Sequence, residues 1–463
     1  MDDRSKSSKT RRIILFPMPF QGHMNPMMQL ANILHSKGFT ISILHHPYNS
    51  PHSSNYPHLA FHLIPDGLSE DQVSIHDIPR VLHLLNTECI GPSRECLRKL
   101  LATHDDIECI ITDAMMYCSK DVVEDLGIHR IVLRTSSVSS FLAFATLPLL
   151  QEKGYYYSDH NNNNNLESRR DDPVPELPPL RVKDIPSIQS QNPDVALKII
   201  GNLVQGTKTA SGLIFNTFPD LEEPNLPNLR EHFRMPTFLI GPFHKFFSAA
   251  SSSLLTQDRS AISWLDTQKP DSVLYVSFGS LAAMDEDHVT EVAWGLANSM
   301  QPFLWVVRPG LVQGSEWLES LPNEFLEITS KRGYIVKWAP QQEVLSHPAV
   351  GGFWTHSGWN SVLESICEGV PMICSSFFGD QTVNSRYIND VWNLGIELEK
   401  GFEREEIESA IRKIMVDGEG QEIRERALRL KEKVQGSLKT DGFSSQSLND
   451  LSDFISSFKS SGA

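Results

Sequence analysis

Short apolar runs alternate along this chain with longer stretches in which apolar residues recur at helical spacing. Ile13–Phe16 is predicted to be a buried strand, and the segment after it, broken by proline and glycine, is predicted to be a loop. Asn25 and Pro26 then predict an N-cap and a first helical position, and Gly38 predicts the end of that helix. Thr40–Leu44 is the next predicted strand. This order is a βαβ unit, which indicates a parallel sheet.

The alternation begins again in the second half of the chain, after a small polar segment at Ser248–Ser253. Before that segment, Cys109–Thr112 is a further predicted strand, Asn161–Asn165 a surface loop, and the proline-rich stretch 173–186 is expected to be extended. The remaining predicted strands are 273–278, 303–307, 334–336, 352–354 and 371–374, and the predicted amphipathic helices lie around 200–207, 289–300, 407–414 and 448–458.

These elements predict two α/β halves, an arrangement that commonly binds ligands in the cleft between the halves. We expect a first domain over 1–245, a linker over 246–260 and a second domain over 261–440. A terminal helix over 441–463 completes the chain and can pack back on the first domain.

Composition narrows the possible functions. The 463 residues carry 41 basic and 57 acidic side chains, for a formal net charge of −16, and such a surface repels nucleic acid and anionic lipid. No stretch approaches the roughly 18–20 apolar residues of a membrane helix. The start is polar and basic without a secretory signal, and the 6 cysteines form no C-x-x-C pair. We therefore expect a cytoplasmic enzyme with reduced thiols and no nucleic-acid partner.

The segment 338–381 carries many of the side chains that are suited to ligand binding. There a predicted strand and a tight turn precede a helix that opens at Trp359. Free backbone N–H groups and the dipole at a helix start favour an anion. His356, Asn360 and Ser361 add side-chain donors at the same point, which predicts a diphosphate site without a lysine.

The groups around this helix start suit the rest of a nucleotide sugar. Glu364, one turn further into the helix, can accept hydrogen bonds from ribose hydroxyls. Trp338 offers a flat face for a base, and Asp380 and Gln381 offer polar groups for sugar hydroxyls.

This segment resembles, without a gap, the signature of plant secondary-product glycosyltransferases, the plant family-1 enzymes that transfer sugar from a UDP-sugar to a small molecule. The resemblance extends to Phe16–His23 and Ser277–Ser280. It is nearest to the branch with steviol-glycoside and benzoxazinoid glucosyltransferases. It implies the GT-B fold, in which two Rossmann-like domains with parallel sheets face each other across a cleft. The first domain would bind the acceptor and the second the UDP-sugar.

The resemblance also implies a role for each position of the donor site. The implied residues are Trp338, Ala339 and Gln341 for uracil, Glu364 for ribose, Ser280, His356, Asn360 and Ser361 for the diphosphate, and Trp359, Asp380 and Gln381 for the sugar. Glutamine at the last position is associated in the family with glucose donors, and histidine with galactose donors. Gln381 therefore favours glucose.

His23 is the candidate general base. It follows the first predicted strand, and the loops at that edge of a parallel sheet are where ligands bind. Its imidazole can accept a proton near neutral pH. Asp113 ends another predicted strand, so it is expected to face the same cleft and to orient the ring. The family uses such a His–Asp pair.

The expected reaction is a direct displacement that needs no metal. The deprotonated acceptor attacks carbon 1 of the sugar from the face opposite UDP, so the configuration inverts from α to β. Asp285-Glu286-Asp287 is interpreted as capping charge on a helix rather than as a metal site. The histidines at 45, 46, 52, 58 and 62 lack regular ligand spacing, so we expect no metal there.

The acceptor pocket is expected to be roomy and apolar. Its candidate lining residues are Met18, Phe20, Met115, Phe141, Ile200, Leu203, Val204 and Phe378. The leading hypothesis is a monomeric UDP-glucosyltransferase that acts on a terpenoid, a phenolic compound or a hormone-like acid. The alternatives are another donor sugar (galactose or xylose), an epimerase, or a non-catalytic UDP-sugar-binding protein.

Overall fold

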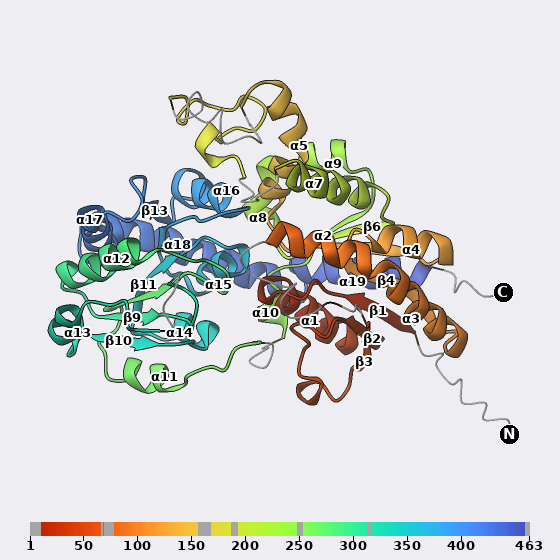
Figure 1. Cartoon of the computed structure of the whole chain (residues 1–463), viewed down its shortest axis with the longest axis horizontal. Helices are drawn as coiled ribbons and strands as arrows, with labels where there is room; N and C mark the ends of the chain where they lie inside the picture. The colour runs from red at the N-terminus through yellow and green to blue at the C-terminus, as the bar shows by residue number, and fades with distance from the viewer. Residues whose placement is uncertain are drawn as a thin grey trace.

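Two parallel β-sheets, each with helices on both faces, make up the protein (Figure 1). The computed structural model describes residues 11–65, 68, 78–155, 168–186, 193–247, 253–312 and 317–458. The α/β class with two parallel sheets is as predicted. The asparagine run 161–165 and the linker positions 248–252 lie outside the described residues.

The first sheet has seven strands in the order β3-β2-β1-β4-β5-β6-β7, and every neighbouring pair is parallel. The strands are β1 Arg12–Phe16, β2 Thr40–His45, β3 Ala60–Leu63, β4 Ile107–Asp113, β5 Arg130–Arg134, β6 Gly212–Phe215 and β7 Thr237–Leu239. The sequence predicted β1, β2 and β4. It did not predict β5, which carries an arginine at each end, or the other short strands.

The second sheet has six strands in the order β10-β9-β8-β11-β12-β13, again all parallel. The strands are β8 Val273–Ser277, β9 Phe303–Val306, β10 Gly333–Val336, β11 Val350–Thr355, β12 Met372–Cys374 and β13 Gly395–Glu397. All but β13 were predicted. The short strand β13 gives little hydrophobic signal in the sequence.

Helices bury both faces of each sheet. Successive side chains of a strand point to opposite faces, so each strand contributes to both layers of the core. In β1, Ile13 and Leu15 pack against one layer of helices, and Ile14 and Phe16 against the other. In β8, Val273 and Leu274 divide between two layers in the same way. Burial of each such side chain contributes about 1.5–3 kcal/mol.

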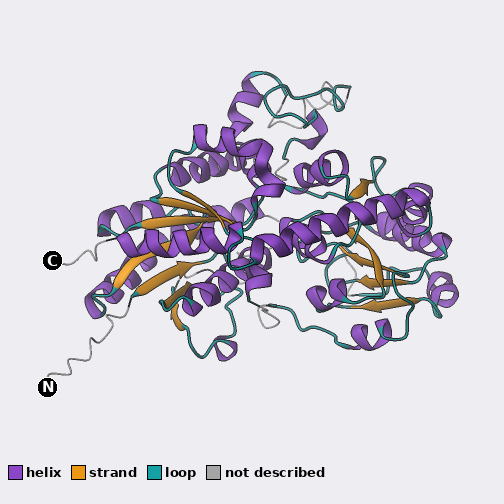
Figure 2. Ribbon diagram, turned by 180° about the vertical axis from the view of Figure 1, so that it is seen from behind, coloured by secondary structure: helices purple, strands orange, loops and turns teal. Residues whose placement is uncertain are grey.

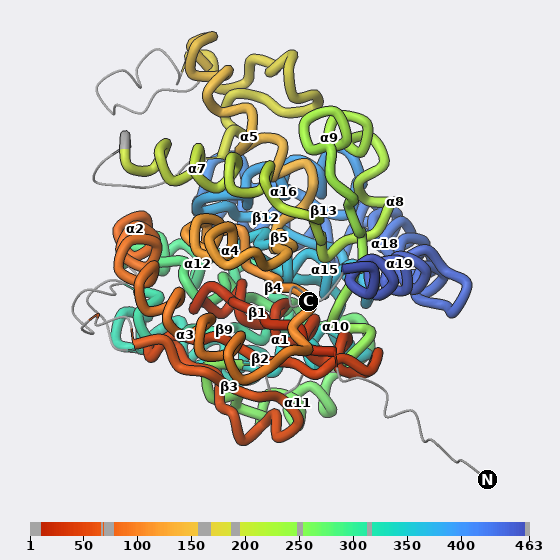
Figure 3. The backbone as a smooth tube through the Cα atoms, turned by 90° about the vertical axis from the view of Figure 1, so that its right-hand side faces the viewer, coloured from red at the N-terminus to blue at the C-terminus, as the bar shows by residue number. Residues whose placement is uncertain are grey.

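The helices of the first half cover both faces of its sheet (Figure 3). They are α1 Gln21–Ser36, η1 Ser53–Asn55, α2 Ile78–Glu88, α3 Ile90–Thr103, α4 Ser119–Leu126, α5 Val138–Glu152, η4 Val182–Asp184, α7 Pro193–Lys208, α8 Pro219–Glu222, η5 Glu223–Asn225, α9 Leu226–His232 and α10 Phe243–Phe246. α3 lies on one side of β1 and β2, and α1 and α10 lie on the other.

The helices after the linker belong to both halves. They are α11 Ser260–Leu265, α12 Glu286–Ser299, α13 Asn323–Thr329, α14 Gln341–Ser346, α15 Trp359–Glu368, α16 Gln381–Arg386, the π-helix η6 Tyr387–Val391, α17 Arg404–Met415, α18 Gly418–Leu438 and α19 Phe443–Ser457. Asp285 caps α12 by accepting a hydrogen bond from the His288 amide at 2.8 Å, so the predicted capping role of the acidic tripeptide is confirmed.

The last helix crosses from the second half to the first. α18 packs on α15, whereas α19 packs on β7 and β4, as the view from behind shows (Figure 2). Leu448, Leu451 and Ile455 of α19 share a core with Ile13 of β1. The end of the chain thus completes the hydrophobic core of the half in which the chain begins.

The stretch 168–186 is compact rather than extended, so this prediction was wrong. An isolated bridge pairs Pro173 with Arg181, and η4 follows directly. Proline favours turns as readily as extended segments. Here the turns bring the two ends of the segment 173–181 together. This stretch places Asp184 against Arg386 of the second half.

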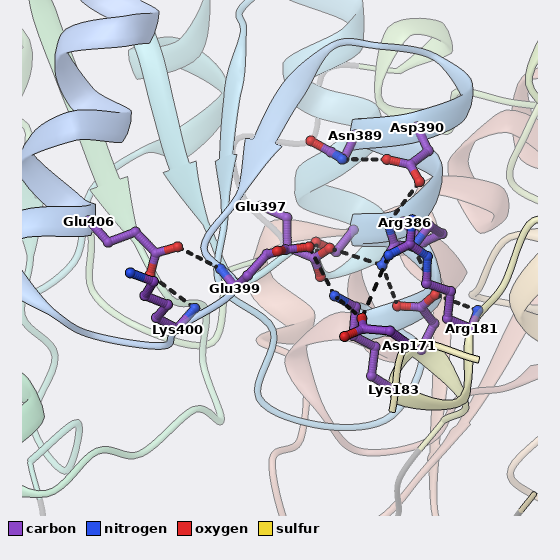
Figure 4. Close-up of polar contacts among 12 residues, drawn as sticks. Asp171, Arg181, Lys183, Arg386, Asn389, Asp390, Glu397, Glu399, Lys400 and Glu406 are labelled. Atoms are coloured by element: carbon purple, nitrogen blue, oxygen red, sulfur yellow. Dashed lines mark hydrogen bonds and ion pairs between the residues drawn. The ribbon is translucent and has the colours of Figure 1, made fainter. Parts of the chain in front are cut away.

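Asp184 and Arg386 form the centre of a network of charged groups between the halves. Figure 4 shows Arg386 with Asp390, Glu397 and Lys183 around it. The Arg386 Nε donates to Asp184 Oδ2 at 2.8 Å and Nη2 donates to Asp184 Oδ1 at 3.1 Å. Both side chains are 1% exposed. Asp390 and Glu397 flank the guanidinium, at 2.8 and 3.5 Å. Lys183 adds a bridge to Glu399, so the second half is tied to η4 by several charges.

Candidate active site

A cavity of about 900 Å³ lies between the two halves and is lined by residues of both. All 11 predicted donor-site residues and His23 contribute to its wall. The carboxyl ends of the central strands of both sheets point toward it, which is where ligands bind in such sheets.

A strand, a turn and a helix start form the floor of the cavity on the second half. β11 ends at Thr355, and Gly358 is the N-cap of α15. Ser357 adopts a positive φ of 62°, and its amide donates to Thr355 Oγ1 at 3.1 Å. This sharp turn directs the first amides of α15, a ten-residue helix, at the cavity, where the helix dipole favours an anion.

Two glycines make room for the imidazole of His356 beside this turn. A Cβ atom on Gly279 would lie 2.7 Å from the ring, and one on Gly358 would lie 2.3 Å from Nε2. Burial lowers the pKa of His356 to about 4, so the ring is neutral at physiological pH. The neutral ring can still donate one hydrogen bond to a phosphate oxygen. Ser280 lies in the cavity wall next to Gly279.

Asn360 and Ser361 occupy the first turn of α15, and each already has a partner. The Asn360 amide donates to the Gly22 carbonyl of the first half at 2.8 Å. Ser361 Oγ accepts from Gln341 Nε2 at 3.0 Å. The first contact joins the predicted diphosphate site to the helix that carries His23.

A carboxylate and two glutamines form the part of the cavity predicted for the nucleoside. Glu364 accepts hydrogen bonds from Gln341 at 2.7 Å and from Gln342 at 2.9 Å. Burial raises the pKa of Glu364, and these hydrogen bonds oppose that shift. Trp338 is half-buried, with its indole N–H on Ser253 at 3.1 Å.

The residues predicted for the sugar differ in how free their side chains are. Gln381 Oε1 accepts from the amides of Phe377 and Phe378 at 2.8 and 3.2 Å, so it holds that loop. Burial raises the pKa of Asp380. Trp359 lines the cavity, yet its ring is 3% exposed and its indole N–H donates to the Asn216 carbonyl at 2.9 Å. Trp359 is therefore mainly a core residue.

His23 lies on the first-half side of the cavity and contacts Asp113 directly. Its Nδ1 is 2.7 Å from Asp113 Oδ2, and the two side chains are 24% and 1% exposed. Asp113 Oδ1 accepts from the Met115 amide at 2.8 Å. Because a carboxylate only accepts, Nδ1 carries the proton and Nε2 keeps its lone pair.

The helix that carries His23 begins earlier than predicted. α1 starts at Gln21, so His23 lies in its first turn and Pro26 lies inside the helix rather than at its first position. Pro26 has no N–H for the Gly22 carbonyl, which instead accepts from Asn360. The proline is tolerated because the carbonyl that it leaves free has found another donor.

Sequence reasoning missed two residues beside this pair, Arg134 and Thr135 at the end of β5. Thr135 Oγ1 is 3.0 Å from His23 Nδ1. The Arg134 guanidinium lies over the Phe141 ring at 4.5 Å, and burial lowers its pKa to about 10. Neither belongs to the family segment quoted above, and β5 itself was not predicted, so no local pattern pointed to them.

Six of the eight predicted acceptor residues line the cavity, and two do not. The six are Met18, Phe20, Met115, Ile200, Leu203 and Phe378. Phe141 is fully buried and packs on Phe233 with the ring centroids 4.6 Å apart, and Val204 faces the same core. Helical periodicity placed both on apolar helices, but it could not tell the cavity side from the core side. Ile78, Leu82, Phe144, Ile199 and Phe377 complete the apolar wall.

Two features are absent from the described residues. None of the helices there is long and apolar enough to cross a membrane. Likewise, the described part of the chain gathers no group of three or more histidine, cysteine or acidic side chains that could hold a metal ion.

The chain matches known glycosyltransferases over nearly its whole length. The family described as UDP-glucoronosyl and UDP-glucosyl transferase matches residues 257–432. UDP-glycosyltransferase 76B1 of Arabidopsis thaliana is 50% identical, with 96% of this chain and 98% of the relative aligned. UDP-glycosyltransferase 76G1 of Stevia rebaudiana is 47% identical, with 99% and 100% aligned.

Solved structures show the same architecture. A UDP-glucose: anthocyanidin 3-O-glucosyltransferase in complex with UDP superposes with a TM-score of 0.83 at 27% identity, covering 97% of this chain and 99% of its own. UGT2 of Phytolacca americana, complexed with UDP-2fluoro-glucose and pterostilbene, gives 0.80 at 27% identity, covering 96% and 100%. The expected GT-B fold is confirmed, and the chain belongs to the plant family-1 UDP-glycosyltransferases.

Proposed function

We propose that this protein transfers glucose from UDP-glucose to a hydroxyl or carboxyl group of a small apolar plant metabolite and forms a β-glucoside. The observation that carries the proposal is the His23–Asp113 pair, which shares one cavity with the donor segment of the second half. A protein that only binds a UDP-sugar has no need of an oriented base.

The second half offers groups for each part of the donor. The amides at the start of α15 and the neutral His356 suit the diphosphate, and Glu364 suits the ribose. Charge that develops on the departing diphosphate would be stabilised at this helix start. Asp380, in the same cavity wall, can accept hydrogen bonds from the sugar hydroxyls.

The first half supplies the base. His23 Nε2 takes the proton of the acceptor as its oxygen attacks carbon 1 of the sugar, and Asp113 stabilises the imidazolium that forms. Base and diphosphate site lie on opposite halves, so attack comes from the side opposite the leaving group. Such a displacement inverts the configuration at carbon 1.

The wall beside His23 supports this acceptor class. Met18, Phe20, Met115, Ile200 and Leu203 give this end of the cavity an apolar surface. Apolar pockets with a few polar groups select compact apolar ligands. Phenolic compounds, terpenoids and hormone-like acids fit this description, and pterostilbene, a phenol, is present in the Phytolacca structure.

The test is incubation with UDP-glucose, UDP-galactose or UDP-xylose and a panel of such acceptors, followed by mass and NMR analysis of the products. We expect β-glucosides from UDP-glucose as the preferred donor. Preference for another UDP-sugar would overturn the donor assignment, and binding without product would overturn the enzymatic one.

His23→Ala is expected to lower turnover by at least about 10²-fold, because no base then accepts the acceptor proton. UDP affinity, measured by titration calorimetry, is expected to stay unchanged, because His23 lies on the acceptor side. His35→Ala, in the last turn of the same helix, is the matched control. Equal turnover of the His23 variant and the wild type would rule out the base.

We further propose that no metal takes part. Turnover in EDTA is expected to equal turnover in Mg²⁺, because the helix start and neutral donors suffice for the diphosphate. Loss of activity in EDTA that Mg²⁺ restores would overturn this.

A further inference from the structure

Asn384 occupies an unusual position between the two halves. It lies on α16, the helix that opens with Gln381, and its side chain is completely buried. No role had been predicted for it, because it follows the family segment. Its hydrogen bonds reach both the turn before α15 and the first half.

The amide of Asn384 uses its full hydrogen-bonding capacity. Its Nδ2 donates to the Ser357 carbonyl at 3.0 Å and to Asp380 Oδ2 at 3.1 Å. Its Oδ1 accepts from Ser137 Oγ at 3.1 Å and from Ser140 Oγ at 3.0 Å. A carbonyl oxygen can only accept, so the Ser357 contact fixes which end of the amide faces Asp380.

These contacts join three parts of the site. Ser357 belongs to the turn before α15, has a positive φ of 62° and donates its own amide to Thr355 Oγ1. Asp380 is the carboxylate in the cavity wall beside the sugar. Ser137 and Ser140 lie at the start of α5 in the acceptor-binding half. One amide thereby ties the Asp380 carboxylate to the turn before α15 and to the start of α5.

We propose that Asn384 is a positioning residue for donor-sugar recognition: it holds the Asp380 carboxylate toward the hexose and anchors it to the acceptor-binding half. The inference rests on the proposed function. Hydrogen bonds to charged groups are the strong ones, so the orientation of Asp380 depends heavily on this donor. In the proposed donor pose the UDP moiety lies against α15 and Trp338, and the turn before α15 keeps its own bond from the Ser357 amide to Thr355 Oγ1, so UDP affinity is expected to depend little on Asn384.

The first test compares UDP-glucose with UDP. In Asn384→Ala the KM for UDP-glucose is expected to rise on the order of 10- to 100-fold, as for the loss of a hydrogen bond to a charged group. The Kd for UDP, measured by titration calorimetry, is expected to stay within about two-fold. Asn389→Ala, in the following π-helix and outside the cavity wall, is the control. An equal loss of affinity for both nucleotides would show a merely structural role and overturn the proposal.

A second test asks whether Asn384 acts through Asp380. In an Asp380→Asn background, Asn384→Ala is expected to add nothing to the KM for UDP-glucose, because the carboxylate that it positions is already gone. Independent, multiplying effects of the two substitutions would overturn the proposal.

If Asn384→Ala does not fold, Ser140→Ala answers the question instead. It removes one of the two donors to Asn384 Oδ1 and leaves Asp380 intact. A rise in the KM for UDP-glucose at constant UDP affinity supports the proposal, and unchanged values overturn it. Failure of the wild type to use any UDP-sugar would instead refute the proposed function, so the two failures are distinct.

Discussion

The imidazole of His23 is useful as a base only in one tautomer, and Asp113 selects it. Asp113 Oδ2 contacts His23 Nδ1, while Asp113 Oδ1 is held by the Met115 amide. Both carboxylate oxygens are thus committed, and Nε2 is left with its lone pair. The 90 residues between the partners are bridged because β1 and β4 are adjacent in the sheet.

Asp113→Asn tests this tautomer argument at the scale of single atoms. The Met115 N–H requires an oxygen, so the new NH₂ group must face His23 and donate to Nδ1. Nε2 then carries the proton and cannot accept one. We expect turnover to fall on the order of 10²- to 10⁴-fold with UDP affinity unchanged.

The matched control is Asp105→Asn, an exposed position shortly before β4. Turnover and titration calorimetry measure both variants. If Asp113→Asn retained more than about a tenth of wild-type turnover, orientation by Asp113 would not matter to catalysis.

At the scale of elements, the start of α5 is set by a buried carboxyl of α8. Glu222 Oε1 accepts from the Val138 amide at 3.0 Å and from Thr217 Oγ1 at 3.1 Å. Burial raises the pKa of Glu222 to about 7. α5 also carries Ser140, which bonds Asn384, and Phe144 of the apolar cavity wall. The protonation state of Glu222 therefore affects α5, the helix that contributes Phe144 to the apolar wall of the cavity.

Glu222→Gln is expected to change how stability depends on pH. The unfolded pKa is about 4.3 and the folded pKa about 7, so the native state holds the proton more tightly. The stability this provides is complete below the unfolded pKa and is lost as pH rises through 7. Between pH 5 and pH 8 the wild type is expected to lose about 2–3 kcal/mol relative to the variant.

Chemical denaturation at several pH values measures this difference, and Glu223→Gln, an exposed neighbour, is the control. Parallel pH profiles for the wild type and Glu222→Gln would show that Glu222 is not protonated near neutrality.

At the scale of the whole molecule, the connections between the two halves include contacts of α15 with the first half, the return of the chain through α18 and α19, and the contact of α16 with the first half. The last of these contains the Asp184–Arg386 pair, in which both side chains are 1% exposed. Removing one partner of a buried ion pair leaves an uncompensated charge, which is why such pairs are sensitive to single substitutions.

Arg386→Met is therefore expected to lower the free energy of unfolding by about 3–5 kcal/mol. Arg429→Met, which removes an exposed helical ion pair, is expected to change it by less than about 0.5 kcal/mol. Urea denaturation measures both. In the double variant Arg386→Met with Asp184→Asn, part of the lost stability is expected to return, and full additivity of the two substitutions would contradict the ion-pair interpretation.

Local patterns were sufficient for much of the fold. Apolar runs identified the central strands β1, β4, β8 and β11, because strands buried on both faces are continuously apolar. They did not identify β5, where Arg130 and Arg134 interrupt the pattern. The start of α1 was placed too late, because Pro26 signals a first helical position. Here the Gly22 carbonyl that Pro26 leaves free accepts a hydrogen bond from Asn360, which is 338 residues from Gly22 in the sequence.

The sequence by itself determined that the chain forms two α/β halves and that 338–381 is the family segment. It also predicted that His23 and Asp113 face the same cleft. Short-range patterns and motif residues carry this information locally. Tertiary structure alone decided that Phe141 faces the core and Phe144 the cavity, that α19 completes the first half, and that Asn384 joins Asp380 to α5. These facts depend on packing and hydrogen bonds between segments more than 200 residues apart in some cases, and no local pattern encodes such contacts.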